Sequence, residues 1–224
     1  IIFLSNFSKK KIEEKINLNN KKTILIPHGI SNIFKFKKKK INSKKIKLIY
    51  VSKFDIYKNQ LELVDIFYKL KRKISVHLTL IGNSNINYKK KIKKKIKYYN
   101  LENDIRVLDN INYKNLPQVY NKHDIKIYPS KAETFGLTML EAIRCGLPTL
   151  ALKSEISKEI LSDAGFYYSN LNNDLQKQLI YILKNKKIVD NKIKKGTNLS
   201  NNYSWKKSSD LTFFFLKRIQ KIEK

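Results

Sequence analysis

Short apolar runs alternate with segments of helical periodicity along nearly the whole chain. The apolar runs are typical of strands, and they lie at residues 1–5, 23–27, 47–52, 75–82, 105–109, 125–130, 149–152 and 165–169. Between them the spacing predicts helices at residues 6–17, 59–70, 88–99, 116–123 and from about 138 to 145, then two helices after residue 169 and an amphipathic helix at residues 205–224.

This alternation predicts an α/β fold, in which a Rossmann-like parallel sheet carries helices on both faces. In such sheets ligands bind beyond the carboxyl ends of the strands. The loops most relevant to function therefore follow Val51, Ile81, Leu108 and Tyr128. A Lys-rich segment at residues 34–45 interrupts the alternation, and we interpret it as a linker.

The composition limits the class of protein. The chain has 224 residues, 42% of them hydrophobic, which suits one full domain with extra elements or two small domains. It does not begin with Met, and we expect it to be part of a longer protein. The one cysteine, Cys145, excludes an intramolecular disulfide and fits a reducing compartment. No apolar run reaches the roughly 18 residues that a membrane span requires.

The formal net charge is +30, from 48 basic and 18 acidic residues. Such a charge suits a nucleic acid or an anionic membrane as partner, or it reflects a general preference for Lys, Asn and Ile at exposed positions. Arg is the residue that grips phosphates and bases with two hydrogen bonds, and this chain has only Arg72, Arg106, Arg144 and Arg218. We therefore favour the compositional interpretation and expect no nucleic-acid partner, while contact with anionic lipid headgroups stays open.

The loop after Tyr128 carries the strongest chemical signal. It turns at Gly136 and enters a helix near Thr138, and a helix N-terminus offers free N–H groups and a positive dipole end to phosphate. Gly136 would let a ligand approach the backbone closely. Two acids, Glu133 in the loop and Glu141 in the first turn, would repel a bare phosphate, but they could accept hydrogen bonds from hydroxyls on either side of it.

A purely structural explanation of Glu141 is equally compatible with the local sequence. Thr138 and Glu141 have the spacing of a capping box, in which both side chains satisfy N–H groups of their own helix. Glu133 has no such alternative except as a solvated loop acid.

Other candidates carry weaker signals. Lys53 and Lys58 flank a turn after the strand at residues 47–52 and could neutralise a diphosphate, although Lys is common throughout the chain. His28 follows a strand, and a lone His is more often structural than catalytic. The chain has no metal-ligand spacing, Walker A loop or dinucleotide fingerprint, so we expect no metal and no bound cofactor.

Together these segments resemble a known family, the retaining glycosyltransferases of family 4 (group 1), and specifically their C-terminal, donor-binding half. The segment "ETFGLTMLEAIRCGLPTLAL" resembles the family's E-x7-E signature and the run that follows it, and "VSKFDIYKNQ" resembles its phosphate-contacting Lys loop. The order and spacing of "FLSNFSKKKI", "ILIPHGISNIF", "DAGFYYSNLNNDLQKQLIYIL" and "YSWKKSSDLTFFFLKRI" are also similar to the family's. The resemblance implies a GT-B fold of which the N-terminal domain is mostly missing.

The resemblance also implies how a nucleotide-diphosphate sugar would bind. Lys53 and Lys58 would stabilise the leaving diphosphate as charge develops on it. The backbone amides that would hold this diphosphate are those of Phe135, Gly136, Leu137 and Thr138.

The remaining implied contacts are with the sugar, the ribose and the base. Glu133 would contact hydroxyls of the transferred sugar, and Glu141 would bind the ribose. The backbone around Val107 and Leu108 would touch the base. On this view Glu133, Lys53 and Lys58 are the catalytic residues.

Three positions depart from the family's pattern. The family's Arg is replaced by Lys53, which removes bidentate phosphate binding, and its two neighbouring Gly positions are Ser52 and Asn59. These differences put the strength of donor binding in question.

We therefore expect three parts: residues 1–40 as the end of an acceptor-binding domain with the linker, residues 41–204 as the nucleotide-sugar domain, and residues 205–224 as the C-terminal helix. The expected activity is transfer of a sugar from a nucleotide-diphosphate sugar to an acceptor hydroxyl, in surface glycan or glycolipid synthesis. The expected location is the cytoplasm with peripheral contact at the inner membrane face, and the isolated chain should be inactive. The alternatives are another GT-B enzyme, such as an epimerase, and a non-enzymatic basic module that binds RNA or lipid.

Overall fold

The computed structural model describes residues 1–224 except 20, 38–40, 42–44, 84–85, 171–172 and 223–224. Its main feature is a six-stranded sheet in which every neighbouring pair is parallel, with the strand order β5-β4-β3-β6-β7-β8. The strands are β3 (Ile46–Val51), β4 (Val76–Ile81), β5 (Ile105–Leu108), β6 (Ile125–Tyr128), β7 (Thr149–Leu152) and β8 (Phe166–Tyr168). The predicted α/β fold with a parallel sheet is confirmed.

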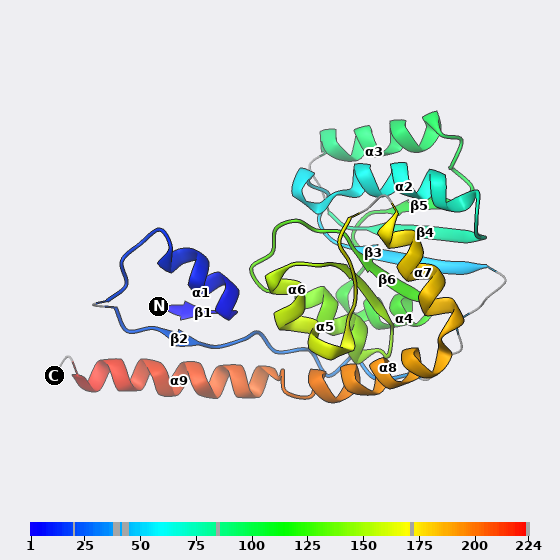
Figure 1. Cartoon of the computed structure of the whole chain (residues 1–224). Helices are drawn as coiled ribbons and strands as arrows, with labels where there is room; N and C mark the ends of the chain where they lie inside the picture. Colours follow the sequence, from blue (N-terminus) through cyan, green and yellow to red (C-terminus); the bar gives the residue numbers. More distant parts are fainter. Residues whose placement is uncertain (20, 38–40, 42–44, 84–85, 171–172, 223–224) are drawn as a thin grey trace.

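Helices cover both faces of this sheet (Figure 1). On one face lie α2 (Gln60–Lys71) and α3 (Ile86–Tyr98), which pack against each other. On the other lie α4 (Leu116–Asn121), α5 (Leu137–Arg144) and α6 (Glu155–Leu161), with α5 in contact with both of its neighbours. The helices α7 (Asp174–Lys184) and α8 (Lys186–Ser200) follow β8, and α8 packs on α5.

Burial on both faces explains why the strands appear as apolar runs in the sequence. Leu48, Ile49 and Tyr50 of β3 are all buried, as are all four residues of β6. Most side chains of the central strands therefore meet a helix and not water, and the exposed charged residues Lys47 and Arg106 lie near the amino ends of β3 and β5.

The strand order reverses between β3 and β6. From β3 the chain moves outward through β4 to the edge strand β5, and then it returns to pair β6 with the other side of β3. The loops after β3 and β6 consequently diverge to opposite faces and leave room between them at the carboxyl edge. Such a switch point is where open α/β sheets bind ligands.

The N-terminal segment forms a small separate unit beside this sheet. It consists of β1 (Ile2–Phe3), α1 (Asn6–Glu13) and β2 (Ile24–Leu25), and the two strands pair in parallel. The C-terminal helix α9 (Trp205–Ile222) runs along it at the bottom of Figure 1. Residues of β2 and α9, including Ile24 and Phe215, line a common groove.

Contacts with α6 and with the loop after β6 fasten the N-terminal unit to the sheet domain. The backbone amides of Asn6 and Phe7 at the start of α1 donate to the carboxylate of Glu159 in α6, at 2.7 and 2.9 Å. The hydroxyl of Ser5 donates to the carbonyl of Thr134, at 2.6 Å, in the loop after β6. The second contact ties this unit directly to the loop that carried the strongest chemical signal.

Helix α6 was not predicted from the sequence, and one predicted boundary lies outside the described residues. Helix α6 has seven residues and begins at Ser154, whose hydroxyl accepts from the amide of Ser157 while Ser157 accepts from the amide of Ser154. Half of the predicted linker at residues 34–45, and the domain boundary at residue 40, lie outside the described part of the chain. The three-part division therefore stays a prediction.

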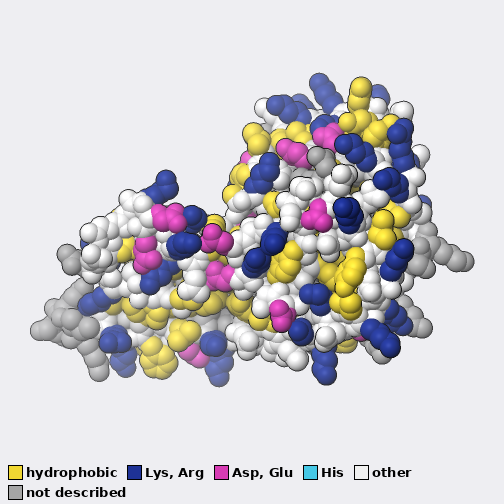
Figure 2. Space-filling view, in the orientation of Figure 1, with side chains coloured by type: hydrophobic (Ala, Val, Ile, Leu, Met, Phe, Trp, Pro, Cys, Tyr) yellow, Lys and Arg dark blue, Asp and Glu magenta, His cyan; other side chains and the backbone are white. Residues whose placement is uncertain are grey.

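Lys and Arg side chains are spread over the face of the molecule that Figure 2 shows, and they do not gather over one element. The same view shows the surface hollowed between the N-terminal unit and the sheet domain. Among the residues that the structure describes, no helix is long and apolar enough to cross a membrane.

Candidate nucleotide-sugar site

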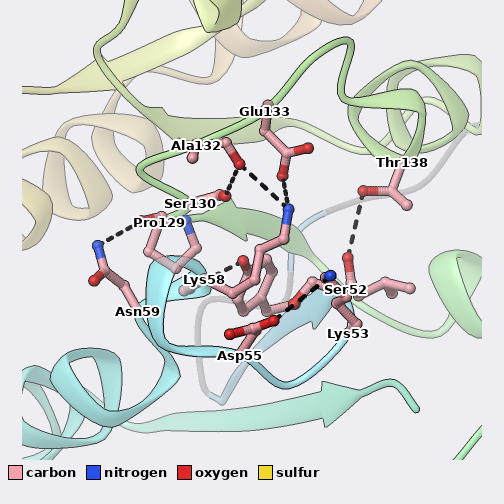
Figure 3. A network of polar contacts seen from close by, with 12 residues as sticks. Ser52, Lys53, Asp55, Lys58, Asn59, Pro129, Ser130, Ala132, Glu133 and Thr138 are labelled. Carbon is pink, nitrogen blue, oxygen red and sulfur yellow. Dashed lines mark hydrogen bonds and ion pairs between the residues drawn. The ribbon is translucent and has the colours of Figure 1, made fainter. Parts of the chain in front are cut away.

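An ion pair at the switch point joins the loops after β3 and β6. The ammonium group of Lys58 contacts the carboxylate of Glu133, and both side chains are largely buried, with 9% and 14% exposed (Figure 3). Lys58 ends a 3-10 turn, η1 (Ile56–Lys58), that follows β3, whereas Glu133 precedes α5. Residues 75 positions apart in the sequence thus form one charged centre at the carboxyl edge of the sheet.

The loop after β6 is held by several hydrogen bonds from the loop after β3. The side-chain amide of Asn59 donates to the carbonyl of Pro129 at 2.8 Å, and the amide of Lys131 donates to the carbonyl of Tyr57 at 2.9 Å. Lys58 also lies 3.5 Å from the carbonyl of Ala132 (Figure 3). The two loops therefore form one connected structure, and a ligand that contacts one is placed relative to the other.

The backbone at Asn59 explains one departure from the family's pattern. Asn59 has φ +59° and ψ +27°, in the left-handed region, and it is the residue from which α2 begins. Gly adopts this conformation freely and Asn does so more readily than other residues. The replacement of Gly by Asn therefore preserves the turn that brings Lys58 into the site.

Helix α5 starts at Gly136, which has φ +85° and ψ +43° and no side chain that caps the first amides. A Cβ atom at this position would lie 2.4 Å from the terminal methyl carbon of Met139. The side chain of Phe135 is buried and packs edge-on against His28 and Tyr203, at ring distances of 5.5 and 5.9 Å. The backbone of the turn is thus fixed by its neighbours while its amide end carries no capping side chain.

The predicted capping box between Thr138 and Glu141 is not present. The helix begins at Gly136, so Glu141 lies in the second turn and not the first. The hydroxyl of Thr138 instead donates to the carbonyl of Val51 at the end of β3, at 3.3 Å. This bond links the start of α5 to the central strand, and it leaves the role of Glu141 to be explained by other contacts.

Glu141 is buried, with 2% of the residue exposed, and two tyrosines hold its carboxylate. Tyr113 donates to Oε1 at 3.0 Å and Tyr120 donates to Oε2 at 3.3 Å. Tyr113 is 45% exposed and its ring packs against that of Phe34, 5.4 Å away. Because Tyr120 is fully buried, the Oε1 side of Glu141, which Tyr113 covers, is closer to solvent than the Oε2 side.

Lys126, on β6, is a charged residue that the sequence analysis did not single out. It is completely buried, and its ammonium group donates to the hydroxyl of Tyr120 at 3.3 Å. Burial lowers the pKa of Lys126, while Glu141 and Glu133 act to raise it. Burial likewise raises the pKa of Glu141, and the positive charge of Lys126 opposes that shift. The sequence feature that could have identified Lys126 is its position in a strand that helices cover on both faces.

The other predicted lysine, Lys53, lies at the rim of the site. Its side chain is 59% exposed, and its ammonium group lies 3.5 Å from the carboxylate of Asp55 (Figure 3). The ammonium groups of Lys53 and Lys58 lie 5.1 and 4.9 Å from the centre of the same ring, that of Tyr57. Both predicted cations therefore come from one short loop, one buried against Glu133 and one facing solvent.

The residues expected near the base lie further along the same sheet edge. Val107 and Leu108 are half-buried at the carboxyl end of β5, and the carbonyl of Leu108 accepts from the amide of Gly82 at 3.3 Å. Gly82 itself passes so close to β3 that an added Cβ atom would lie 1.8 Å from the carbonyl oxygen of Ser52. The ends of β3, β4 and β5 are thus tightly joined, and contact with a base stays a prediction.

His28 and the acidic groups carry no further signal of catalysis or metal binding. The ring of His28 packs between those of Phe135 and Trp205, which is a structural arrangement. Across the described residues, no cluster of His, Cys, Asp and Glu side chains is arranged to hold a metal ion. Metal-independent chemistry remains a prediction.

The six-stranded parallel sheet with this switch point has the fold of GT-B glycosyltransferases. The solved structure of Anabaena HepE in complex with UDP and glucose superposes with a TM-score of 0.83 at 19% identity, covering 97% of this chain and 62% of that one. This similarity establishes the architecture of the chain.

The chain belongs to the family of glycosyl transferases group 1, whose model matches residues 31–199. It is 25% identical over 213 residues to an uncharacterized glycosyltransferase of Methanocaldococcus jannaschii, covering 92% of this chain and 56% of that protein. It is 32% identical over 146 residues to the capsular polysaccharide biosynthesis glycosyltransferase CapH of Staphylococcus aureus, covering 63% of this chain and 39% of CapH. The chain thus spans about half or less of the length of these relatives.

Proposed function

We propose that this chain is the donor-binding part of a retaining glycosyltransferase of family 4 that uses a nucleotide-diphosphate sugar. The observation that carries the proposal is the meeting of Lys58 and Glu133 at the switch point, in front of the uncapped start of α5. A cation, an acid and a helix start without a capping side chain, together at one position, suit a ligand with both negative charge and hydroxyl groups.

In this proposal the diphosphate lies against the start of α5. The first amides of the helix, at Gly136, Leu137 and Thr138, would donate to its oxygens, together with the amide of Phe135. Lys58, which is buried beside Glu133, and Lys53, at the rim of the site, would neutralise the charge that grows on the diphosphate as the sugar leaves. Because no metal is invoked, these two lysines supply the positive charge.

The two glutamates would bind hydroxyl groups on either side of the diphosphate. Glu133 would accept from the transferred sugar with its carboxylate held in place by Lys58. Glu141 would accept from the ribose on the side where Tyr113 now donates. The base would then extend toward Val107 and Leu108 at the end of β5.

The transfer itself would require a second domain that binds the acceptor. Residues 1–40 would contain the end of that domain and the linker, residues 41–204 the donor domain, and residues 205–224 the helix that returns beside the N-terminal unit. The match to CapH supports a role in synthesis of a surface polysaccharide or glycolipid. We place this activity at the cytoplasmic face of a membrane, with peripheral contact through basic side chains.

Titration calorimetry with UDP and with GDP tests this proposal on the chain as it exists. The wild type should bind one of them, and Glu141→Gln should bind it at least about tenfold more weakly because the amide accepts fewer hydrogen bonds than the carboxylate. A binding curve that is the same in Glu141→Gln, or the absence of binding to either nucleotide, would contradict the proposal. A non-specific basic module would instead lose affinity steeply with salt and would be indifferent to the glutamate.

A further inference from the structure

Lys126 is a buried charge that the proposed reaction does not use directly. It is the second residue of β6, which lies between β3 and β7 in the middle of the sheet. Its side chain has no exposed surface, although a fully buried ammonium group is strongly disfavoured unless other groups compensate for its lost hydration. The groups that surround it therefore indicate its role.

Aromatic rings and one hydroxyl form the immediate environment of the ammonium group. It lies 5.0 Å from the ring centre of Tyr120 on α4 and 5.7 Å from that of Tyr128 on its own strand. It donates to the hydroxyl of Tyr120 at 3.3 Å. The faces of aromatic rings carry partial negative charge, which favours the cation.

The hydroxyl of Tyr120 connects Lys126 to the carboxylate of Glu141. Because Lys126 donates to the oxygen of Tyr120, the hydroxyl hydrogen of Tyr120 is available to donate to Oε2 of Glu141 at 3.3 Å. Tyr113 donates to Oε1 at 3.0 Å. The carboxylate thus accepts at both oxygens, and the chain of donors begins at the fully buried side chain of Lys126.

Other titratable groups also face this centre. Glu133 from the loop after β6 and Cys145 at the end of α5 favour the charged form of Lys126, as Glu141 does. Burial raises the pKa of Glu141 and would favour its neutral form, while Lys126 has the opposite effect. Without the lysine, the effect of burial on Glu141 would be opposed only by the two tyrosines.

We propose that Lys126 is a positioning residue which, through the hydroxyl of Tyr120, keeps Glu141 ionised and oriented as an acceptor for the ribose hydroxyls of the donor. This inference rests on the proposed function, because the ribose is the ligand that would use Glu141. A neutral carboxyl group would present a hydroxyl to the ribose and lose one acceptor position. Lys126 therefore acts on binding without touching the ligand.

The first test needs no ligand. The titration of Glu141 is followed by NMR of protein labelled with carboxyl-¹³C glutamate, and its signal is assigned by its loss in Glu141→Gln. In Lys126→Met, which shortens the side chain by one atom and removes its charge, the midpoint should rise by about one pH unit or more. An unchanged midpoint would refute the proposal.

Stability is measured on the same variants. Lys126→Met removes one partner of a buried pair, so it should lower the unfolding temperature at neutral pH, and the loss should shrink as the pH is lowered and Glu141 becomes neutral. A residue that only filled space in the core would cost the same stability at both pH values. If the Met variant does not fold, Tyr120→Phe removes only the connecting hydroxyl, and it should shift the midpoint of Glu141 in the same direction.

The second test compares two ligands on the folded variant. UDP should bind Lys126→Met roughly tenfold more weakly than wild type at neutral pH, and the loss should shrink as the pH is raised and Glu141 ionises. Pyrophosphate has no ribose, so its affinity should be unchanged. Equal weakening of both ligands would refute the proposal. A wild type that binds no nucleotide would instead refute the proposed function. In that case the titration of Glu141 would still decide whether Lys126 is coupled to it.

Discussion

At the scale of single residues, the charge balance of the site depends on Lys58. Its partner Glu133 would otherwise stand as an acid in front of a site for a negatively charged ligand. Since both side chains are largely buried, removing one leaves the other without compensation for its lost hydration. In the proposed site Lys58 would therefore serve two purposes: it pairs with Glu133, and it would offer positive charge to the diphosphate.

The first prediction concerns Lys58→Met. Nucleotide affinity should fall at least about tenfold, because the positive charge is lost and Glu133 then repels the diphosphate. Calorimetric titration of UDP measures this, with Lys71→Met as the matched control. Lys71 is also paired with an acid, Asp104, but it lies at the amino edge of the sheet, since Asp104 directly precedes β5. Equal affinities in the two variants would count against the site.

The second prediction concerns Gly136→Ala. A left-handed conformation costs an L-residue roughly 1–2 kcal/mol, and the added Cβ atom would also crowd Met139 and the space before the amides of α5. Thermal unfolding should show the loss of stability, and titration should show a loss of nucleotide binding. Gly146→Ala is the control, because Gly146 has φ +77° but lies at the far end of α5. It should lose stability and keep its nucleotide affinity.

At individual positions, the sequence predicted some contacts and not others. Lys58 and Glu133 could be selected because their loops follow neighbouring strands whose carboxyl ends meet. The capping box of Thr138 was wrong because a helix start depends on the backbone at Gly136, which the spacing of side chains does not reveal. Lys126 was overlooked because, in the alternating run of β6, a Lys resembles the exposed side of a strand.

At the scale of whole elements, the strands were readily predicted and the short helix α6 was not. A strand covered on both faces is nearly continuous in apolar residues, and this pattern is local. Helix α6 has a capping box that uses Ser157 where the usual pattern has Glu or Gln, so the usual sequence signal for a helix start is missing. It nevertheless matters, because Glu159 on it binds the start of α1.

The third prediction tests how the C-terminal helix is joined to the rest. Gly29 is buried, and a Cβ atom there would lie 2.0 Å from the backbone nitrogen of Trp205 at the start of α9. Gly29→Ala should therefore displace α9, with a loss of about 1–3 kcal/mol of stability and faster hydrogen exchange in that helix. Ser31→Ala, nearby on the same segment, should have little effect on either measurement. A Gly29→Ala protein with wild-type exchange in α9 would contradict this packing.

At the scale of the whole molecule, the N-terminal unit and α9 lie together beside the sheet domain (Figure 1). The unit is a pair of two-residue strands with one helix, which is too small to form a core of its own. Ser5 of this unit donates to the carbonyl of Thr134, so movement of the unit would also displace the loop that holds Glu133. The GT-B fold could be anticipated from the order of the segments, whereas this contact could not.

The fourth prediction is that the 224 residues bind the nucleotide but do not transfer sugar, because the proposed acceptor-binding domain is needed for the reaction. A time course with UDP-glucose or GDP-mannose and oligosaccharide acceptors, analysed by mass spectrometry, should show no product above the level without protein. Clear turnover by the isolated chain would overturn the division into donor and acceptor domains.

The location of the diphosphate is the central claim, and amide chemical shifts test it most directly. Titration of ¹⁵N-labelled protein with UDP should move the amide signals of Phe135, Gly136, Leu137 and Thr138 more than any others, together with that of Lys58. Inorganic phosphate at the same ionic strength provides the reference for general charge effects. Shifts scattered over the surface lysines, with the start of α5 unchanged, would contradict the account.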